Sequence, residues 1–377
     1  MKRGVIHSVT ATMNLIGTIV GVGMFSTPLA FSKSGFVGAV VLVGIVAALQ
    51  ILIHLFYAEA VIASKEHVRL PGLAEKYLGK GTRNIVGVIA LLQSFGSMLA
   101  YTILGGIFLH ILLSPYIPWI PEIFQVTFGL LVGIIIAGNI AWVSRIELWA
   151  TLALIAVLVG ITIMTSLHIN PAHYFAGGNQ QSIFLTYGVL LFALSGLQAI
   201  PEMEEVLRDK HRYYRTAIIS GILTSTVLVA AFGFAVWGVS GTATTEDAVS
   251  GLRAVLGDKI IFTGSILGFL AIITSYITVA NNTKQTLHLD FKWKKSLAWL
   301  ATITVPLFLI TIASNSLLKI VSFSGAVLGG STAIIVCLLY IAITKKNLLG
   351  SKKLGIPPMI AYITITTLVA GIIGKLM

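Results

Sequence analysis

The chain has 377 residues, of which 56% are hydrophobic and only 10% are charged. Soluble globular domains carry about a quarter charged residues, so this composition excludes a soluble protein and indicates an integral membrane protein. The formal net charge of +12 would fit a nucleic-acid partner only if the basic residues were clustered on a soluble domain, and they are instead spread between apolar runs.

The apolar runs are continuous and about 20 residues long, which is the length of a membrane-spanning helix, whereas barrel strands are shorter and alternate. The sequence therefore predicts an all-α membrane protein with about 11 transmembrane helices. The expected spans are 8–31, 36–61, 84–114, 122–143, 147–167, 183–202, 214–240, 260–284, 297–313, 318–344 and 355–375.

The basic residues predict the orientation of these spans. If the N-terminus is cytoplasmic, only five of the 25 Lys and Arg residues lie on the outer side and the other 20 lie inside. The five outer residues are Lys33, Arg253, Lys259, Lys319 and Lys375. An excess of Lys and Arg in cytoplasmic segments is the general rule for membrane proteins. We expect a multi-pass protein of the cell membrane with the N-terminus cytoplasmic and the C-terminus outside.

Two of the apolar runs contain helix-breaking residues at matching places. The first reads Asn14 to Pro28, with Gly21 and Gly23 near its middle, and the sixth carries Gly196 before Pro201. In each run a proline follows a glycine after five residues. Paired breaks of this kind are typical of the substrate site of a transporter near the bilayer midplane. The alternative is that the glycines only permit close helix packing.

The spacing of the breaks predicts one domain over 1–377 built from a 5+5 inverted repeat. Repeat one covers about 8–167, repeat two covers about 183–344, and an extra helix covers about 355–375. An odd number of spans per repeat inverts the second copy relative to the first. The stretches 68–80 and 245–257 occupy corresponding places and are expected to be interfacial amphipathic helices or polar loops.

The eighth span contains Ala271, Thr274 and Ser275 in the order Ala-x-x-Thr-Ser. Two adjacent hydroxyls and a backbone carbonyl are neutral oxygen ligands that suit a small hard cation without burying net negative charge. Alternatively, the two hydroxyls bond to carbonyls of their own helix, as such residues often do in membranes.

Taken together, these motifs resemble those of a known group of transporters. The string Gly17-Thr18-x-x-Gly21-x-Gly23-Met24-x-x-x-Pro28, the Phe192-x-Leu194-Ser195 segment and the Ala-x-x-Thr-Ser segment resemble sodium-coupled amino acid transporters of the LeuT-type fold. The first string is most similar to the amino acid/auxin and aromatic amino acid permease branch of the amino acid–polyamine–organocation superfamily. The architecture matches over nearly the whole chain, and the motifs match over some thirty residues.

The resemblance implies two sets of site residues. The sodium ion that bridges spans 1 and 8 would be held by Gly17, Val20, Ala271, Thr274 and Ser275. The substrate would be held by Gly21, Val22, Gly23, Met24, Tyr101, Phe192, Ala193, Ser195 and Gln198. In the first break the amides receive the substrate carboxylate, and in the sixth span the carbonyls receive its amine. No cofactor other than the coupling ion is implied.

The chain departs from the family pattern in ways that bear on coupling. The residues after the first break, Met24 to Ser26, offer no asparagine for a second sodium ion. The fifth span has no lysine that would replace the ion, which favours sodium. Proton coupling stays open because His54, Glu59 and His110 lie within spans, where ionisable residues are candidates for function.

The sequence thus predicts a secondary active transporter that couples sodium to a neutral amino acid, aromatic or aliphatic. The expected pocket side chains are uncharged: Met24, Gln93, Ser97, Leu197 and Thr278. The alternatives are a proton-coupled permease and a non-transporting amino acid sensor on the same fold. Because no paired intramembrane carboxylates, metal cluster or nucleophile–base pair occurs, we do not expect an enzyme. The expected partners are the amino acid, sodium and the lipid bilayer. No motif encodes the oligomeric state or the transport direction.

Overall fold

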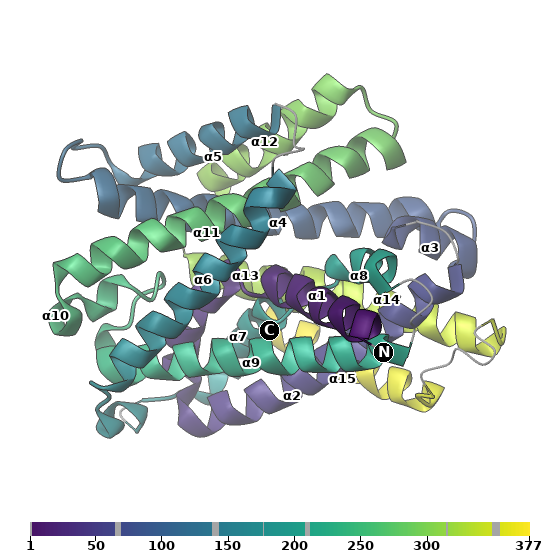
Figure 1. Cartoon of the computed structure of the whole chain (residues 1–377), viewed down its shortest axis with the longest axis horizontal. Coiled ribbons are helices and arrows are strands. Elements are labelled where there is room, and N and C mark those ends of the chain that lie inside the picture. The colour runs from purple at the N-terminus through teal and green to yellow at the C-terminus, as the bar shows by residue number, and fades with distance from the viewer. Residues whose placement is uncertain are drawn as a thin grey trace.

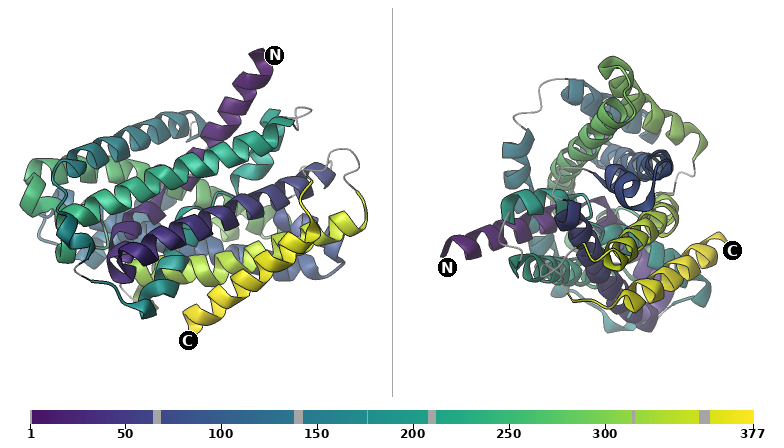
Figure 2. Two further views of the ribbon diagram at one scale, coloured as in Figure 1. Left: turned by 90° about the horizontal axis from the view of Figure 1, so that it is seen from below. Right: turned by 90° about the vertical axis from the view of Figure 1, so that its right-hand side faces the viewer.

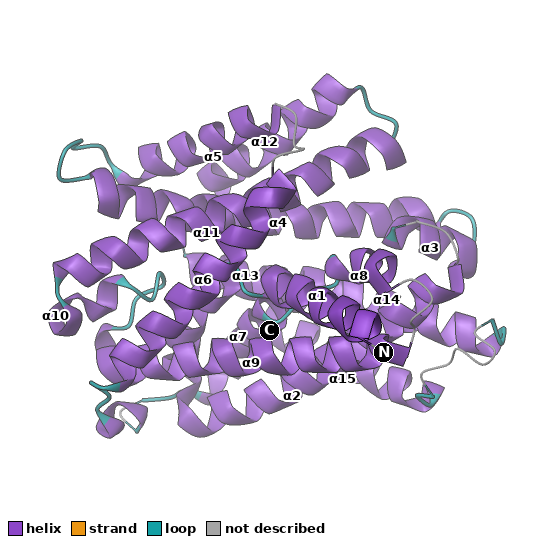
Figure 3. Cartoon of the chain, viewed as in Figure 1, coloured by secondary structure: helices purple, strands orange, loops and turns teal. Residues whose placement is uncertain are grey.

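The computed structural model describes residues 2–64, 69–137, 143–175, 177–207, 212–313, 316–348 and 355–377. Throughout these ranges the regular structure is helical and contains no strand, as Figure 3 shows. Most of the long helices run side by side along the long axis of the molecule (Figure 1). The N-terminal end of the first helix projects from this bundle (Figure 2).

Among the described residues, the first half of the chain has six α-helices and one 3-10 helix. In chain order they are α1 (Lys2–Ile19), η1 (Val22–Ser26), α2 (Thr27–Ser64), α3 (Leu70–Leu78), α4 (Thr82–Leu113), α5 (Pro121–Ala137) and α6 (Val143–Ser166). Residues 138–142, which close the range expected for the fourth span, lie outside the described part of the chain.

Among the described residues, the second half contains nine α-helices, four short 3-10 turns and two π-helical segments. These are η3 (Pro171–Tyr174), η4 (Gln180–Ser182), α7 (Ile183–Ala193), α8 (Ala199–Leu207), α9 (Arg212–Ser240), η5 (Gly241–Ala243), η6 (Ser250–Leu252), α10 (Arg253–Leu256), α11 (Asp258–Gln285), η7 (Thr286–Asp290), α12 (Lys295–Ile312), α13 (Leu317–Phe323), η8 (Ser324–Gly329), α14 (Gly330–Lys345) and α15 (Pro358–Leu376).

The expected boundary between the first two spans is a kink within α2. Gly35 has φ +75° and ψ +167° in an otherwise helical element. Glycine adopts positive φ without the steric cost of a side chain. A Cβ placed on Gly178 would lie 2.8 Å from the Gly35 Cα, so the segment after α6 packs tightly onto this kink.

Seven stretches within the described ranges are long and apolar enough to cross a membrane, and α5 and α7 are shorter apolar helices. Each of the eleven expected ranges is mostly helical where it is described, apart from the breaks at 20–21 and 194–198 and a few end residues. Which of them cross the bilayer, and the inverted repeat, stay predictions.

The two expected interfacial stretches differ in form. Within 68–80 the structure has the nine-residue helix α3, which buries Leu73, Ala74 and Tyr77 and begins after Val68, a residue outside the described part. Within 245–257 it has only the short turns η6 and α10. The two stretches therefore differ in length of helix.

The first break lies at the centre of the helix packing. The short helix η1 contacts α2, α4, α7, α9 and α13. Around it, α2 packs against α7, α9 and α14, and α4 packs against α5, α11 and α12. Segments far apart in the sequence therefore meet at the first break, which positions the candidate site.

Candidate substrate and ion site

The first break interrupts the helix between α1 and η1. The last amide to bond back into α1 is that of Val20, which donates to the Ile16 carbonyl at 2.9 Å. Gly21 is extended, with φ −146° and ψ −151°, and the next turn closes with Met24 N–H donating to the Gly21 carbonyl at 3.3 Å. The first amides of a helix have no partner inside it. Gly21, Val22 and Gly23 therefore present amide groups at the positive end of a short helix.

The second break covers residues 194–198, between α7 and α8. The Ser195 amide donates to the Phe192 carbonyl at 3.1 Å, and helix resumes where the Ala199 amide donates to the Gly196 carbonyl at 3.0 Å. A carbonyl oxygen has two lone pairs. The Phe192 carbonyl can therefore accept a further donor, such as a substrate ammonium group.

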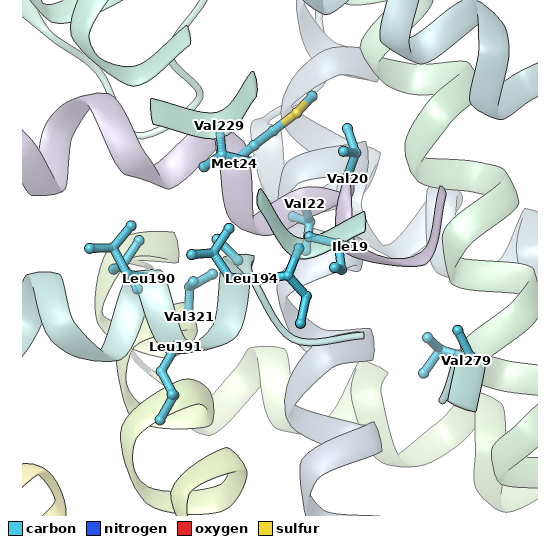
Figure 4. Packing of buried hydrophobic residues seen from close by; sticks show 14 of the residues in the cluster. Ile19, Val20, Val22, Met24, Leu190, Leu191, Leu194, Val229, Val279 and Val321 are labelled. Carbon is cyan, nitrogen blue, oxygen red and sulfur yellow. The ribbon is translucent and has the colours of Figure 1, made fainter. Parts of the chain in front are cut away.

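The two breaks are in direct contact. A Cβ placed on Gly23 would lie 2.6 Å from the Ala193 Cα and 2.9 Å from Phe192 Cδ1. Real Cβ atoms do not approach this closely, so only glycine fits here. Figure 4 shows the apolar side chains that pack around this contact, among them Val22 and Met24 from the first break and Leu194 from the second.

Tyr101 and Ser275 meet beside the first break. A Cβ on Gly21 would lie 3.2 Å from the Tyr101 hydroxyl and 3.9 Å from the Ser275 hydroxyl. The two hydroxyls, one from α4 and one from α11, are therefore near neighbours at the first break. The Tyr101 ring also stacks on Tyr276, with centroids 6.0 Å apart, which fixes its direction. A residue expected to bind substrate thus lies next to one expected to bind the ion.

The expected ion ligands lie where α1 ends and α11 passes. The break at Ile19 leaves the last carbonyls of α1, including that of Gly17, without helical amide partners. Ser275 lies close to Gly21, and Thr274 and Ala271 lie in the same helix, the side chain of Ala271 being outside the described set. Within the described ranges no group of three His, Cys, Asp or Glu residues occurs that suits a transition metal. The neutral oxygens present fit sodium better than a transition metal.

A cavity of about 710 Å³ joins the two breaks. Of the expected site residues, nine line it: Gly17, Gly21, Val22, Gly23, Tyr101, Phe192, Ser195, Gln198 and Ser275. Val20, Met24, Ala193 and Thr274 are not part of its wall. Met24 is only 2% exposed and belongs to the hydrophobic core. The structure therefore brings most of the expected residues to one cavity, whereas these four are not among the residues that line it.

The cavity extends from the breaks toward one end of the bundle. Its wall includes Arg69, Glu202 and Thr286, which the charge pattern places on the cytoplasmic side. On the other side of the first break, the Phe25 ring packs edge-to-face on Phe108 and Phe232, with centroids 5.3 and 6.0 Å apart. The geometry is that of a site open toward the expected cytoplasmic side and closed by aromatic rings on the opposite side.

Two residues of α2 contact the second break. The Gly196 amide donates to His54 Nε2 at 3.0 Å, and the Gln50 side-chain amide donates to the Leu191 carbonyl at 2.7 Å. His54 was expected only as an ionisable residue, and Gln50 was not expected at all. A pair of polar residues one helical turn apart in an apolar run is the sequence signal that marks them.

The sequence is similar to a known protein family and to a known transport protein. The profile described as the tryptophan/tyrosine permease family matches residues 6–374. The tyrosine-specific transport system 1 of Haemophilus influenzae is 24% identical over 297 residues, which cover 72% of this chain and 70% of that protein.

Two solved structures are similar in fold. The crystal structure of MhsT in complex with L-phenylalanine has a TM-score of 0.63 at 16% identity, covering 96% of this chain and 98% of that one. The structure of Mhp1, a nucleobase-cation-symport-1 family transporter in a closed conformation with bromovinylhydantoin bound, has a TM-score of 0.60 at 13% identity, covering 98% and 91%. Both likenesses confirm the expected all-helical LeuT-type fold.

Proposed function

The chain belongs to the tryptophan/tyrosine permease family, and from this premise we propose that it is a sodium-coupled symporter of an aromatic amino acid such as L-tyrosine. It is a multi-pass membrane protein and an amino acid transporter, not an enzyme. The position of Tyr101 and Ser275 beside Gly21 supports the proposal, because it brings an expected substrate residue next to an expected ion residue.

The two breaks offer complementary backbone groups to the substrate, amides for its α-carboxylate and carbonyls for its α-ammonium group. The amides of Gly21, Val22 and Gly23 form the positive end of a helix, which binds a carboxylate well. The carbonyls of Phe192 and Ala193, with the Ser195 hydroxyl, receive the ammonium group from the other side. In this pose the substrate satisfies backbone groups that the membrane interior would otherwise leave unpaired.

The substrate side chain then extends toward Ser97 and Thr278. Ser97 lies four residues before Tyr101 and Thr278 three residues after Ser275, so each is one turn closer to the expected cytoplasmic side, and both line the cavity. One turn is about 5 to 6 Å along the helix axis, comparable to the length of an aromatic side chain. Their hydroxyls suit a phenol or indole N–H, and the relative from Haemophilus influenzae is named as tyrosine-specific.

The ion is proposed to bind the carbonyls of Gly17, Val20 and Ala271 and the hydroxyls of Thr274 and Ser275. An ion here ties the end of α1 to α11, and Ser275 in turn contacts Tyr101. Substrate and ion would therefore each raise the affinity for the other, since coupling between two sites is reciprocal. Transport would follow from rocking of α1, α2 and α7–α9 against the remaining helices.

Uptake of radiolabelled L-tyrosine into proteoliposomes tests this proposal. An inward sodium gradient and an inward proton gradient are applied separately to the wild type and to the double variant Thr274→Ala, Ser275→Ala. We expect sodium to drive uptake in the wild type and the double variant to lose this stimulation. His168→Leu, a change at an exposed histidine after α6, serves as the control for reconstitution.

Other outcomes point to the alternatives. Uptake driven by protons without any sodium effect would overturn the ion site and support a proton-coupled permease. Measurable amino acid binding with no uptake under either gradient would instead support a non-transporting sensor.

A further inference from the structure

Gln50 and His54 lie one turn apart on α2 and are 2% and 0% exposed. Both point at α7 and the segment 194–198, which follows it. Polar side chains this deeply buried are expected to have hydrogen-bond partners. Their partners here are a backbone carbonyl near the end of α7 and a backbone amide within the break.

The break itself creates the groups that these side chains bond. In an uninterrupted helix the Leu191 carbonyl would accept from Ser195 N–H, and Gly196 N–H would donate to the Phe192 carbonyl. The Ser195 amide turns to Phe192 instead, which leaves the Leu191 carbonyl and the Gly196 amide without helical partners. Gln50 Nε2 donates to the first at 2.7 Å, and His54 Nε2 accepts from the second at 3.0 Å.

The same contacts determine the tautomer of His54. The Gly196 amide is a donor, so Nε2 must hold a lone pair. Nδ1 lies 2.7 Å from the Gln50 carbonyl, which is an acceptor, so Nδ1 carries the proton. A neutral imidazole has one donor and one acceptor nitrogen, and His54 uses both. A doubly protonated ring would turn a second N–H toward the Gly196 amide.

Gly196 also packs against α1, the helix that ends at the first break. A Cβ placed on Gly196 would lie 2.7 Å from Ile19 Cγ1 and 2.8 Å from Leu15 Cδ1. Ile19 is the last residue of α1, directly before the first break. A shift of Gly196 would therefore also displace the end of α1.

We propose that Gln50 and His54 are positioning residues that hold the unwound segment 194–198 at a fixed separation between its flanking helices. Gln50 holds the α7 end and neutral His54 holds the Gly196 amide, so that Ser195 and Gln198 face the cavity. His54 acts as a fixed acceptor and not as a moving proton site. The effect on substrate rests on the proposed function, whereas the effect on the backbone of 194–198 does not.

Four variants separate this role from a general role in folding. His54→Leu removes the acceptor, and His54→Gln replaces it with an amide oxygen of similar reach. Gln50→Met removes the donor at nearly constant shape and provides a second test if His54→Leu does not fold. His168→Leu is the matched control, because His168 Nδ1 also contacts the carbonyl four residues earlier, at 3.1 Å, but on an exposed site.

Two measurements are made on each purified full-length variant: amide hydrogen exchange and the uptake kinetics of L-tyrosine. We expect His54→Leu and Gln50→Met to speed exchange in peptides covering 190–200 while peptides from α4 and α5 stay unchanged. The KM for L-tyrosine should rise about tenfold with a smaller change in the maximal rate, as expected when binding geometry is lost. His54→Gln should restore both values to within about threefold of the wild type.

The outcomes are distinguishable. Unchanged exchange at 190–200 in both His54→Leu and Gln50→Met overturns the inference, as does a His54→Gln variant as impaired as His54→Leu. If the wild type does not transport L-tyrosine, the proposed substrate fails, and local exchange alone then decides the positioning role.

Discussion

The hydroxyls of Tyr101 in α4 and Ser275 in α11 both lie within 4 Å of the Cβ position of Gly21 at the first break. Tyr101 stands at the expected substrate site and Ser275 at the expected ion site. Since each hydroxyl has few hydrogen-bonding positions, a ligand that engages one of them changes what the other can bond. This pair therefore connects the two proposed sites.

Removing either hydroxyl is expected to weaken coupling between ion and substrate. Tyr101→Phe and Ser275→Ala should each raise the KM for L-tyrosine about five- to tenfold, which corresponds to the loss of one hydrogen bond. Because the residues are in contact, the double variant should cost less than the product of the single effects. Uptake at several sodium concentrations measures this, and strictly multiplicative effects would show that the pair is not coupled.

The contact between the breaks predicts a severe effect at Gly23. Gly23→Ala would place a Cβ 2.6 Å from the Ala193 backbone, which cannot move as a flexible side chain would. We expect a loss of about 1–3 kcal/mol in stability and little remaining uptake. Gly44→Ala is the matched control, because a Cβ there meets nothing within 4 Å. Thermal unfolding in detergent measures both, and equal midpoints would contradict the close contact.

The direction of the cavity predicts which side admits reagents. Cys337 is the sole cysteine of the chain and is buried, so an introduced cysteine reacts over a low background. Gln198→Cys lies in the cavity wall and should react with a membrane-impermeant thiol reagent in inside-out vesicles, with L-tyrosine slowing the reaction. Phe175→Cys, at a site 80% exposed beyond α6, should react only in right-side-out vesicles. The opposite pattern would reverse the predicted orientation.

The proposed side-chain pocket predicts a change in selectivity at Ser97. Ser97→Ala removes a hydroxyl that lines the cavity one turn from Tyr101. Uptake of L-tyrosine should fall about fivefold relative to L-phenylalanine, since only tyrosine carries a phenol to bond. Competition between the two amino acids in one assay measures the ratio. An unchanged ratio would place the phenol elsewhere.

Sequence patterns determined the features that depend on local chemistry. Long apolar runs must form helices in a membrane because backbone groups have no water to bond. The glycines at 21, 23 and 196 mark where those helices are interrupted, and the structure breaks there, with η1 beginning at Val22 and α7 ending at Ala193. The Ala-x-x-Thr-Ser segment indicated a candidate ion site because its expected ligands lie close together in the sequence.

Only the tertiary structure decided which residues face one another across helices. The rotation of one helix relative to another is set by packing over many distant residues, and no short motif encodes it. This is why Met24 lies in the core instead of the cavity wall, and why the alignment of Tyr101 with Ser275 needed coordinates. The role of Gln50 and His54 was hidden for the same reason: each bonds a backbone group more than 140 positions away in the sequence, and that group lacks a partner only because the helix breaks there.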